Sequence, residues 1–389
     1  MHHGALGIVR SAGMLGVPVF HIHQEPSCVL DHSRYSRGHL TFPPGATAGQ
    51  KVEILRRFSR DEGRAVLIPV DDASAMFVAD HAPSLDDAFL FPDQPLGLAR
   101  SLASKREMHE LCLRHDVPTP AAAFPQSEAD VLGHAREAIF PVVAKRIDAS
   151  LPAADGAPAV SIAQSQGELL AAYRLMRSPE DSNVMLQEYI PGTAESIWML
   201  NAYFDAHSDC LLAFTGQKIR QSPPHTGATT LGVCRANPAV AESTTRFMKA
   251  LGYRGILDIG YRWDARDGQY KLLDVNPRIG ATFRLFVAAD GMDVLRAMYL
   301  DLTGQPVAES AQQDGRRWIV EPLDLRSSWL YFRGGELTPA GWLRSLRHVE
   351  ETGYWARRDP LPWLVEWASL LVDQVRKRLR RRLGRLRRR

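Results

Sequence analysis

The segment KLLDVNPRIG, residues 271–280, carries side chains that could bind a metal ion beside an anion. Asp274 and Asn276 alternate at the end of a predicted strand, so their side chains point to the same side. Oxygen ligands at this spacing suit Mg²⁺, which also takes phosphate oxygens and water. Arg278 follows, where it could meet an anion. Alone, the pattern is more typical of a strand end followed by an Asn-Pro turn.

A second run, residues 255–264, is expected to form a β-hairpin with residues 269–276 through a turn at 265–268. Asp258 on this strand could then reach the same ion. Ligands from two adjacent strands could bridge the phosphates of a nucleotide and neutralise charge during phosphoryl transfer. The hairpin can also be aligned so that Gly260, and not Asp258, stands at the first ligand position.

Cations precede this hairpin on other predicted elements. Lys145 lies in the apolar strand FPVVAKRID, and Lys105 opens an earlier helix. A lysine on a buried strand must meet an anion or extend its ammonium group to solvent. Lys218 and Arg220 alternate on a further strand, where they could form an anion clamp or remain solvated. Together with the acidic hairpin, these cations favour a phosphate site.

The segment QEYIPGTAE, residues 187–195, ends a strand in a Pro-Gly turn. Backbone groups at Glu188, Tyr189 and Ile190 could read the edge of an adenine ring, and Glu195 could accept hydrogen bonds from ribose hydroxyls. The alternative is a turn flanked by two solvated acids.

In this order the residues resemble the ATP-grasp superfamily, which includes D-alanine–D-alanine ligases and many carboxylate–amine ligases. The resemblance covers about residues 100–300, and more weakly the preceding α/β domain of that family. It implies ATP and Mg²⁺ as cofactors, with Mn²⁺ as an alternative ion. Carried over by residue, it implies two phosphate-binding lysines (Lys105, Lys145), an adenine-binding segment (Glu188, Tyr189, Ile190), a ribose acceptor (Glu195), a triphosphate-contacting lysine (Lys218), magnesium ligands (Asp258, Asp274, Asn276) and an arginine that steadies the transferred group (Arg278).

Two positions depart from the family pattern. Asp274 stands where the family usually has glutamate, and the loop at 148–160 is a glycine-poor version of the phosphate-covering flap. The implied reaction is activation of a carboxylate as an acyl phosphate, followed by attack of an amine, with Arg278, Lys218 and Arg220 as catalytic residues. Small-molecule carboxylates and amines are the implied substrates. A thiol or hydroxyl acceptor, or a non-catalytic ATP-binding scaffold recruited to a membrane, remain alternatives.

The elements that must position these residues are those of an α+β fold. Strand-like runs occur at residues 140–148, 184–190, 196–204 and 211–219, with few long helices between them. The expected organisation is a small α/β domain lacking its first strand (1–100), an ATP-grasp domain (101–310), an extension without a readable pattern (311–360) and a basic amphipathic helix (361–389).

Charge is concentrated at one end of the chain. The 389 residues carry a net charge of +3, but residues 376–389 contain ten Arg or Lys, so the remainder sums to −7. Leucines and other apolar residues recur every three or four positions from Leu364 to Leu386. Such a helix could lie on an anionic membrane surface or an acidic partner, or dock on the core. Nucleic acid is not expected as a partner.

The remaining signals favour an ordinary intracellular enzyme. Four cysteines without a CxxC pair, and no apolar run of about 18 residues, indicate a cytoplasmic protein, peripheral at the inner membrane face if the tail binds lipid. His2, His3, His21 and His23 have no acidic or thiolate partner at zinc-like spacing, so no metal site is expected there. Arg10, Arg37 and Arg284 could contact an anion, although a surface or structural role is more typical.

Overall fold

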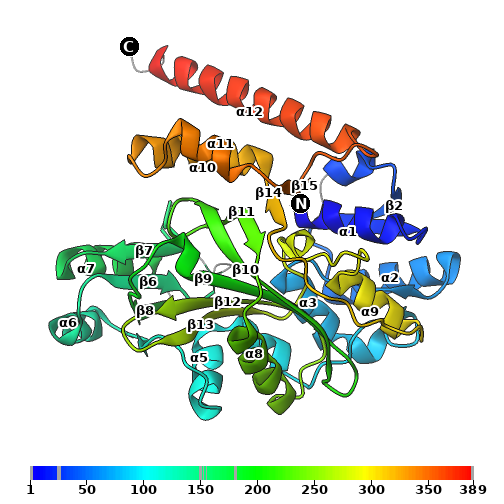
Figure 1. Cartoon of the computed structure of the whole chain (residues 1–389), viewed down its shortest axis with the longest axis horizontal. Helices are drawn as coiled ribbons and strands as arrows, with labels where there is room; N and C mark the ends of the chain where they lie inside the picture. Colours follow the sequence, from blue (N-terminus) through cyan, green and yellow to red (C-terminus); the bar gives the residue numbers. More distant parts are fainter. Residues whose placement is uncertain are drawn as a thin grey trace.

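The computed structural model describes residues 3–23, 28–148, 151, 153–154, 156–178 and 182–386, the last ten of these as helical backbone only. The chain folds into an N-terminal region, a small four-stranded lobe, a large seven-stranded sheet and a long C-terminal helix (Figure 1).

The N-terminal region contains two separate two-stranded parallel sheets, β1–β2 and β3–β4, with short helices around them. Its elements are α1 (His3–Gly13), β1 (Val19–His23), η1 (Val29–His32), β2 (Ser36–Thr41), α2 (Ala48–Glu62), β3 (Ala65–Val66), α3 (Asp72–Asp80), η2 (Ala82–Ser84), β4 (Phe89–Leu90) and α4 (Leu98–Ala103). The apolar face of α1 packs into the core of the large sheet, with Leu6 and Val9 almost fully buried. The region is therefore docked on the rest of the molecule.

The small lobe is an antiparallel sheet in the order β5-β8-β6-β7, packed against two helices. Its elements are β5 (Ala122–Ala123), α6 (Glu128–Glu137), β6 (Val142–Arg146), β7 (Val160–Ala163), α7 (Gln166–Met176) and β8 (Val184–Glu188). The predicted strands at 140–148 and 184–190 are confirmed as β6 and β8, the two inner strands. In their pairing Lys145 lies opposite Met185, whereas Glu188, the start of the 188–190 segment, lies opposite Val142.

The large sheet has the order β13-β12-β9-β10-β11-β14-β15. Its elements and flanking helices are α5 (Lys105–Arg114), η3 (Ala194–Ser196), β9 (Ile197–Phe204), β10 (Cys210–Ser222), β11 (Ala228–Cys234), α8 (Pro238–Ala250), β12 (Gly255–Asp264), β13 (Gln269–Asn276), η4 (Phe283–Leu285) and α9 (Val294–Leu302). Every residue of β9 is buried. Leu200 and Ala202 face a core shared with α5 and α8, whereas Met199 and Tyr203 face one shared with α1 and α9. Helices thus cover both faces, which explains the apolar run in the sequence.

The predicted hairpin is confirmed as β12 and β13, joined by residues 265–268. Gly268 closes the turn with φ of +69°, in the left-handed region that favours glycine. Asp258 pairs with Asn276 and Gly260 pairs with Asp274. The hairpin therefore brings all three expected metal ligands to one end of the large sheet.

Residues beyond 310 continue the same sheet, so the predicted boundary there cuts a continuous structure. β14 (Arg317–Ile319) pairs with β11, and β15 (Val349–Thr352) pairs with β14. Between them lie α10 (Glu321–Arg333) and α11 (Pro339–Ser345). Strands this short leave too few alternating positions to be recognised in a sequence. The chain then enters α12 (Leu361–Leu386), which runs along the outside of the molecule in Figure 1.

Candidate active site

Three polar side chains form a row across neighbouring strands at the end of the large sheet. Asn201 on β9, Asp258 on β12 and Asn276 on β13 are cross-strand neighbours. Asn201 Nδ2 donates to Asp258 Oδ1 at 2.9 Å, and Asn276 Nδ2 donates to Asp258 Oδ2 at 3.2 Å. The strand register therefore fixes Asp258 between two amides.

Asp274 completes this group from the exposed side. Its Oδ2 lies 3.4 Å from Asn276 Nδ2, and its carboxylate lies over Gly260. A Cβ at Gly260 would come within 2.5 Å of Asp274 Oδ1. The alternative alignment placed Gly260 at the first ligand position. In the structure Gly260 pairs with Asp274, and its lack of a side chain leaves room for the Asp274 carboxylate.

The electrostatics of this group fit a hard cation. Burial raises the pKa of Asp258 to about 6, an effect that Arg278 opposes and the neighbouring Asp274 carboxylate reinforces. Two carboxylates around one amide carry negative charge that the amide protons only partly offset. Carboxylate and amide oxygens are the donors that Mg²⁺ takes in proteins. Asp258, Asp274 and Asn276 are therefore a suitable ligand set for magnesium.

Arg278 connects this row to the N-terminal region. Its Nε donates to Asp72 Oδ1 at 2.9 Å, at the first residue of α3, and its Nη2 donates to Asn276 Oδ1 at 3.2 Å. Its Nη1 lies 4.0 Å from Asp258 Oδ2. The sequence analysis assigned Asp72 no role, although Asp71 and Asp72 directly follow an apolar run at residues 65–70. A pocket lined mainly by apolar side chains, among them Ile68, Pro92 and Met298, adjoins Arg278.

Three lysines from different elements are electrostatically coupled to Asp274. Burial lowers the pKa of Lys145 to about 8 and also lowers the pKa values of Lys105 and Lys218, while the Asp274 carboxylate raises each of them. Lys105 Nζ donates to the Ile147 carbonyl oxygen at 3.0 Å. Removing ammonium groups from water without a full set of partners favours their neutral form. An anion placed among these lysines would restore their charge.

Arg262 is a site residue that sequence reasoning missed. Its guanidinium lies 5.8 Å from the centre of the Tyr189 ring, its Nη2 donates to the Gly192 carbonyl oxygen at 2.7 Å, and it lowers the pKa of Lys145. The sequence could have indicated this position, because residues 258, 260 and 262 alternate along one strand and therefore point to the same side as Asp258. Asn201, in contrast, left no signal in its buried strand.

The predicted adenine-binding segment lies where β8 ends. The backbone N–H and C=O groups of Tyr189 and Ile190 have no backbone partner among the described residues. The Glu188 carboxylate accepts from the Ala121 N–H at 3.1 Å, from Lys271 Nζ at 3.1 Å and from Arg266 Nη2 at 3.0 Å. Glu188 thus holds the segment to the hairpin by its side chain, while the next two residues present free backbone groups.

Glu195 lies on η3, and its side chain is exposed. Its carbonyl oxygen accepts from Gln217 Nε2 at 2.7 Å, and its carboxylate has no partner in the part of the chain that the structure describes. The predicted flap, residues 148–160, lies partly outside the described residues.

The prediction that Lys218 and Arg220 share one strand face is wrong. The pairing of β10 with β11 shifts register between these two residues, which breaks the alternation. Arg220 is 3% exposed, and its Nε and Nη2 donate to the two carboxylate oxygens of Asp324 on α10 at 2.8 and 2.9 Å. Its guanidinium therefore holds α10 to the sheet and is not available to clamp a phosphate.

Two of the other arginines are also buried in ion pairs. Arg10 Nε donates to Asp359 Oδ2 at 2.9 Å, and Arg284 Nη1 donates to Asp293 Oδ2 at 2.6 Å. Arg37 is exposed. Arg10 and Arg284 thus have the structural role that their sequence context favoured.

Similar proteins exist among curated sequences and solved structures, although no protein-family model matches the chain. A D-aspartate ligase from Enterococcus faecium is 25% identical over 281 residues, which is 68% of this chain and 66% of that protein, just under two thirds of its length. The crystal structure of an L-amino acid ligase from Bacillus licheniformis superposes with a TM-score of 0.61 at 16% identity, covering 80% of this chain and 75% of that one.

A biotin carboxylase domain of the 2-oxoglutarate carboxylase from Hydrogenobacter thermophilus, solved with MgADP and bicarbonate, gives a TM-score of 0.57 at 15% identity, covering 81% of this chain and 71% of that one. At such identities the structural likenesses establish the fold. Together with the sheet order and the acidic hairpin, they show an ATP-grasp fold.

Proposed function

We propose that this protein is an ATP- and Mg²⁺-dependent ligase that joins a small-molecule carboxylate to an amine. The observation that carries the proposal is the pair of carboxylates, Asp258 and Asp274, that meet the Asn276 amide at 3.2 and 3.4 Å. The ammonium groups of Lys105, Lys145 and Lys218, from three separate elements, are desolvated and lie within electrostatic reach of the Asp274 carboxylate. Desolvated cations facing paired carboxylates suit a polyanion bound together with a divalent cation. The names of the similar D-aspartate and L-amino acid ligases support an amino acid as one substrate.

Each part of the nucleotide has a candidate partner. The free backbone groups of Tyr189 and Ile190 would bind the adenine edge, and the unpaired Glu195 carboxylate the ribose. The three lysines would bind the phosphates. Asp258, Asp274 and Asn276 would hold magnesium, which neutralises charge on the phosphates during transfer.

In the proposed reaction a carboxylate oxygen of the substrate attacks the γ-phosphorus of ATP. A new O–P bond forms, the bond to the bridging oxygen breaks, and ADP leaves. The amine then attacks the acyl carbon, loses a proton, and inorganic phosphate leaves as the amide forms. Arg278, held by Asp72, supplies positive charge beside the transferred group. The chain contributes position and charge and needs no side-chain nucleophile.

A matrix of carboxylic acids and amines, beginning with D- and L-amino acids, tests this function. The full chain with Mg·ATP should release ADP with at least one pair, and mass spectrometry should find a product with the combined mass less one water. If ADP is released only with thiols or alcohols, the acceptor is a thiol or a hydroxyl and not an amine. Binding of Mg·ATP without turnover in any mixture would identify a non-catalytic nucleotide-binding protein.

The depressed pKa of Lys145 predicts a pH dependence. Below about 8 its ammonium is protonated and can bind a phosphate, and above that pKa the charge is lost. We expect kcat/KM for ATP to fall about tenfold per pH unit on the alkaline side, because this parameter reports groups of the free enzyme. Lys145→Arg is the matched control, since arginine stays charged and should move the decline to higher pH. A profile that is identical in both proteins would exclude Lys145 from phosphate binding.

We also propose that α12 binds an anionic membrane surface, which would place the protein at the periphery of the inner face. No helix in the described part of the chain has the length and hydrophobicity to span a bilayer. What supports surface binding is that Leu364, Leu371 and Val375 are 52%, 63% and 56% exposed, on a helix that continues into the basic run. Exposed leucines beside clustered cations suit an interfacial helix.

Flotation with vesicles tests the role of α12. The full chain should float with phosphatidylglycerol-containing vesicles, and high salt should release it. Vesicles of phosphatidylcholine alone serve as the control. A chain stopped after Gln374 should stay at the bottom of the gradient; if it floats equally well, the tail is not the membrane-binding element.

A further inference from the structure

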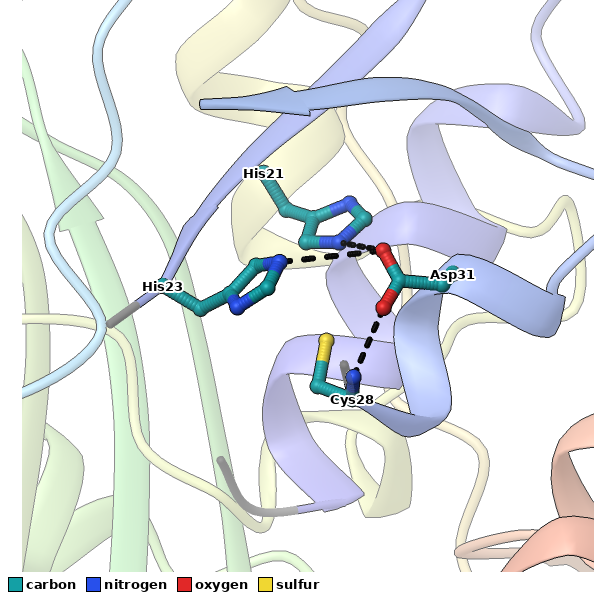
Figure 2. Close-up of side chains that lie close together, drawn as sticks. All are labelled: His21, His23, Cys28 and Asp31. Atoms are coloured by element: carbon teal, nitrogen blue, oxygen red, sulfur yellow. Dashed lines mark hydrogen bonds and ion pairs between the residues drawn. The ribbon is translucent and has the colours of Figure 1, made fainter. Parts of the chain in front are cut away.

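A second group of chemically reactive side chains lies in the N-terminal region, within the β1–η1–β2 unit. His21 and His23 are two residues apart on β1 and therefore point to one side. Figure 2 shows these rings converging with Cys28 and Asp31, which come from the start of η1. One ligand atom from each of the four lies within 4.8 Å of the others. The expectation that the histidines lack acidic and thiolate partners is wrong.

The tertiary structure gathers ligands that the sequence spacing did not suggest. His21 Nε2 lies 3.0 Å and His23 Nε2 3.7 Å from Asp31 Oδ1. His39, the neighbour of His21 on β2, directs its Nδ1 to the same oxygen at 3.0 Å. Three imidazoles thus meet one carboxylate oxygen, an arrangement suited to a shared cation.

His23 supplies an independent indication of a ligand. The residue is 6% exposed, and neither ring nitrogen has a hydrogen-bond partner among the described residues. Buried polar groups are nearly always satisfied, so an unpartnered imidazole aimed at a thiol and a carboxylate requires an explanation. A metal ion bound to one of its nitrogens would provide one.

A contact with β2 orients one of the histidine rings for metal binding. His21 Nδ1 lies 3.1 Å from Ser36 Oγ, a contact that can fix the tautomer with Nε2 free for a metal. Binding of a metal ion would deprotonate the Cys28 thiol.

We propose that His21, His23, Cys28 and Asp31 bind a divalent transition-metal ion of the zinc class, at a site separate from the ATP site. One sulfur, two imidazole nitrogens and one carboxylate oxygen match the donors that zinc takes, whereas Mg²⁺ and Ca²⁺ prefer oxygen alone. In a tetrahedral zinc site, neighbouring ligand atoms lie roughly 3.3–3.8 Å apart. The four ligand atoms here lie within 4.8 Å of one another, so side-chain adjustments of about 1 Å would form the site.

The geometry assigns this ion a structural role. Four protein ligands fill a tetrahedral site and leave no position for a substrate. The ion would tie β1 to η1, with His39 on β2 held against the Asp31 ligand. η1 in turn contacts α12, so the metal would fasten the part of the N-terminal region that supports the C-terminal helix.

Metal titration of the full chain, stripped with a chelator, tests the site. We expect one equivalent of Zn²⁺ to bind and to raise the midpoint of thermal unfolding. Co²⁺ should give tetrahedral absorption bands and a sulfur-to-cobalt charge-transfer band. Cys28→Ser should abolish the charge-transfer band. Cys28→Ser and His23→Gln, each as a single variant, should weaken Zn²⁺ binding by about 100-fold.

Matched controls separate ligation from folding. His32→Gln changes an exposed histidine next to Asp31, Cys210→Ser changes a distant thiol, and Asp274→Asn changes the other candidate metal site; all three should keep the Co²⁺ spectrum. Metal-free Cys28→Ser should unfold at the same temperature as the metal-free native chain. Substoichiometric Zn²⁺ binding by the native chain, or a Co²⁺ spectrum that Cys28→Ser leaves unchanged, would overturn the proposal.

Discussion

Replacing Asp274 by asparagine is expected to lower kcat for ADP formation by about 10³-fold, as removal of one preorganised charge-stabilising group does in other enzymes. The substitution keeps the shape of the side chain but removes the charge that faces the three lysines and the proposed magnesium ion. The measurement is steady-state ADP release with an active acid–amine pair at saturating Mg·ATP.

The same substitution should leave the fold intact. Asp274 is exposed, and among the described residues its carboxylate accepts one long hydrogen bond, from Asn276. We therefore expect the free energy of unfolding to change by less than about 0.5 kcal/mol. Asp209→Asn, which removes an exposed carboxylate paired with Lys249, is the matched control and should keep full activity. If Asp274→Asn turns over within tenfold of the native rate, Asp274 is not a metal ligand in this reaction.

Replacing Arg220 by alanine should instead cost stability, by about 3–5 kcal/mol. The substitution would leave the Asp324 carboxylate, which is 1% exposed, without its bidentate partner. The hydroxyls of Thr230 and Ser328 remain, at 3.0 and 3.3 Å, but they carry no charge. Urea-induced unfolding of the full chain measures the effect.

Two further variants test the cause of this loss. Arg174→Ala removes an exposed arginine that pairs with Glu128 in the same forked manner, and it should cost less than about 1 kcal/mol. Arg220→Met combined with Asp324→Leu should recover most of the stability, because no unpaired charge remains buried. An Arg220→Ala protein as stable as Arg174→Ala, but inactive, would return Arg220 to the anion-binding role that its sequence position suggested.

Local patterns in the sequence predicted the strands and the hairpin that carry the candidate site. The hairpin of β12 and β13 follows from alternation and a short turn, and its pairing aligns Asp258 with Asn276. Apolar runs around Lys145 and before Glu188 predicted the inner strands of the small lobe. These features depend on neighbours in the chain, so the sequence contains the information directly.

Other features depend on which distant segments meet. A register shift on β10 turned Arg220 toward Asp324, 104 residues away, and no periodicity in the sequence predicts such a shift. Asn201 acquired its place beside Asp258 only when β9 and β12 paired. Long-range pairing is set by the packing of the whole core, which local propensity does not encode.

The sequence by itself determined the ATP-grasp fold and its acidic hairpin, whose residue types and spacing are local. The tertiary structure alone decided the partners of the buried charges. It placed Arg220 in an ion pair, added Arg262 and Asp72 to the site, and gathered His21, His23, Cys28 and Asp31 around one point. The physical reason is that a buried polar group must find its partner in space, wherever the chain brings one within reach.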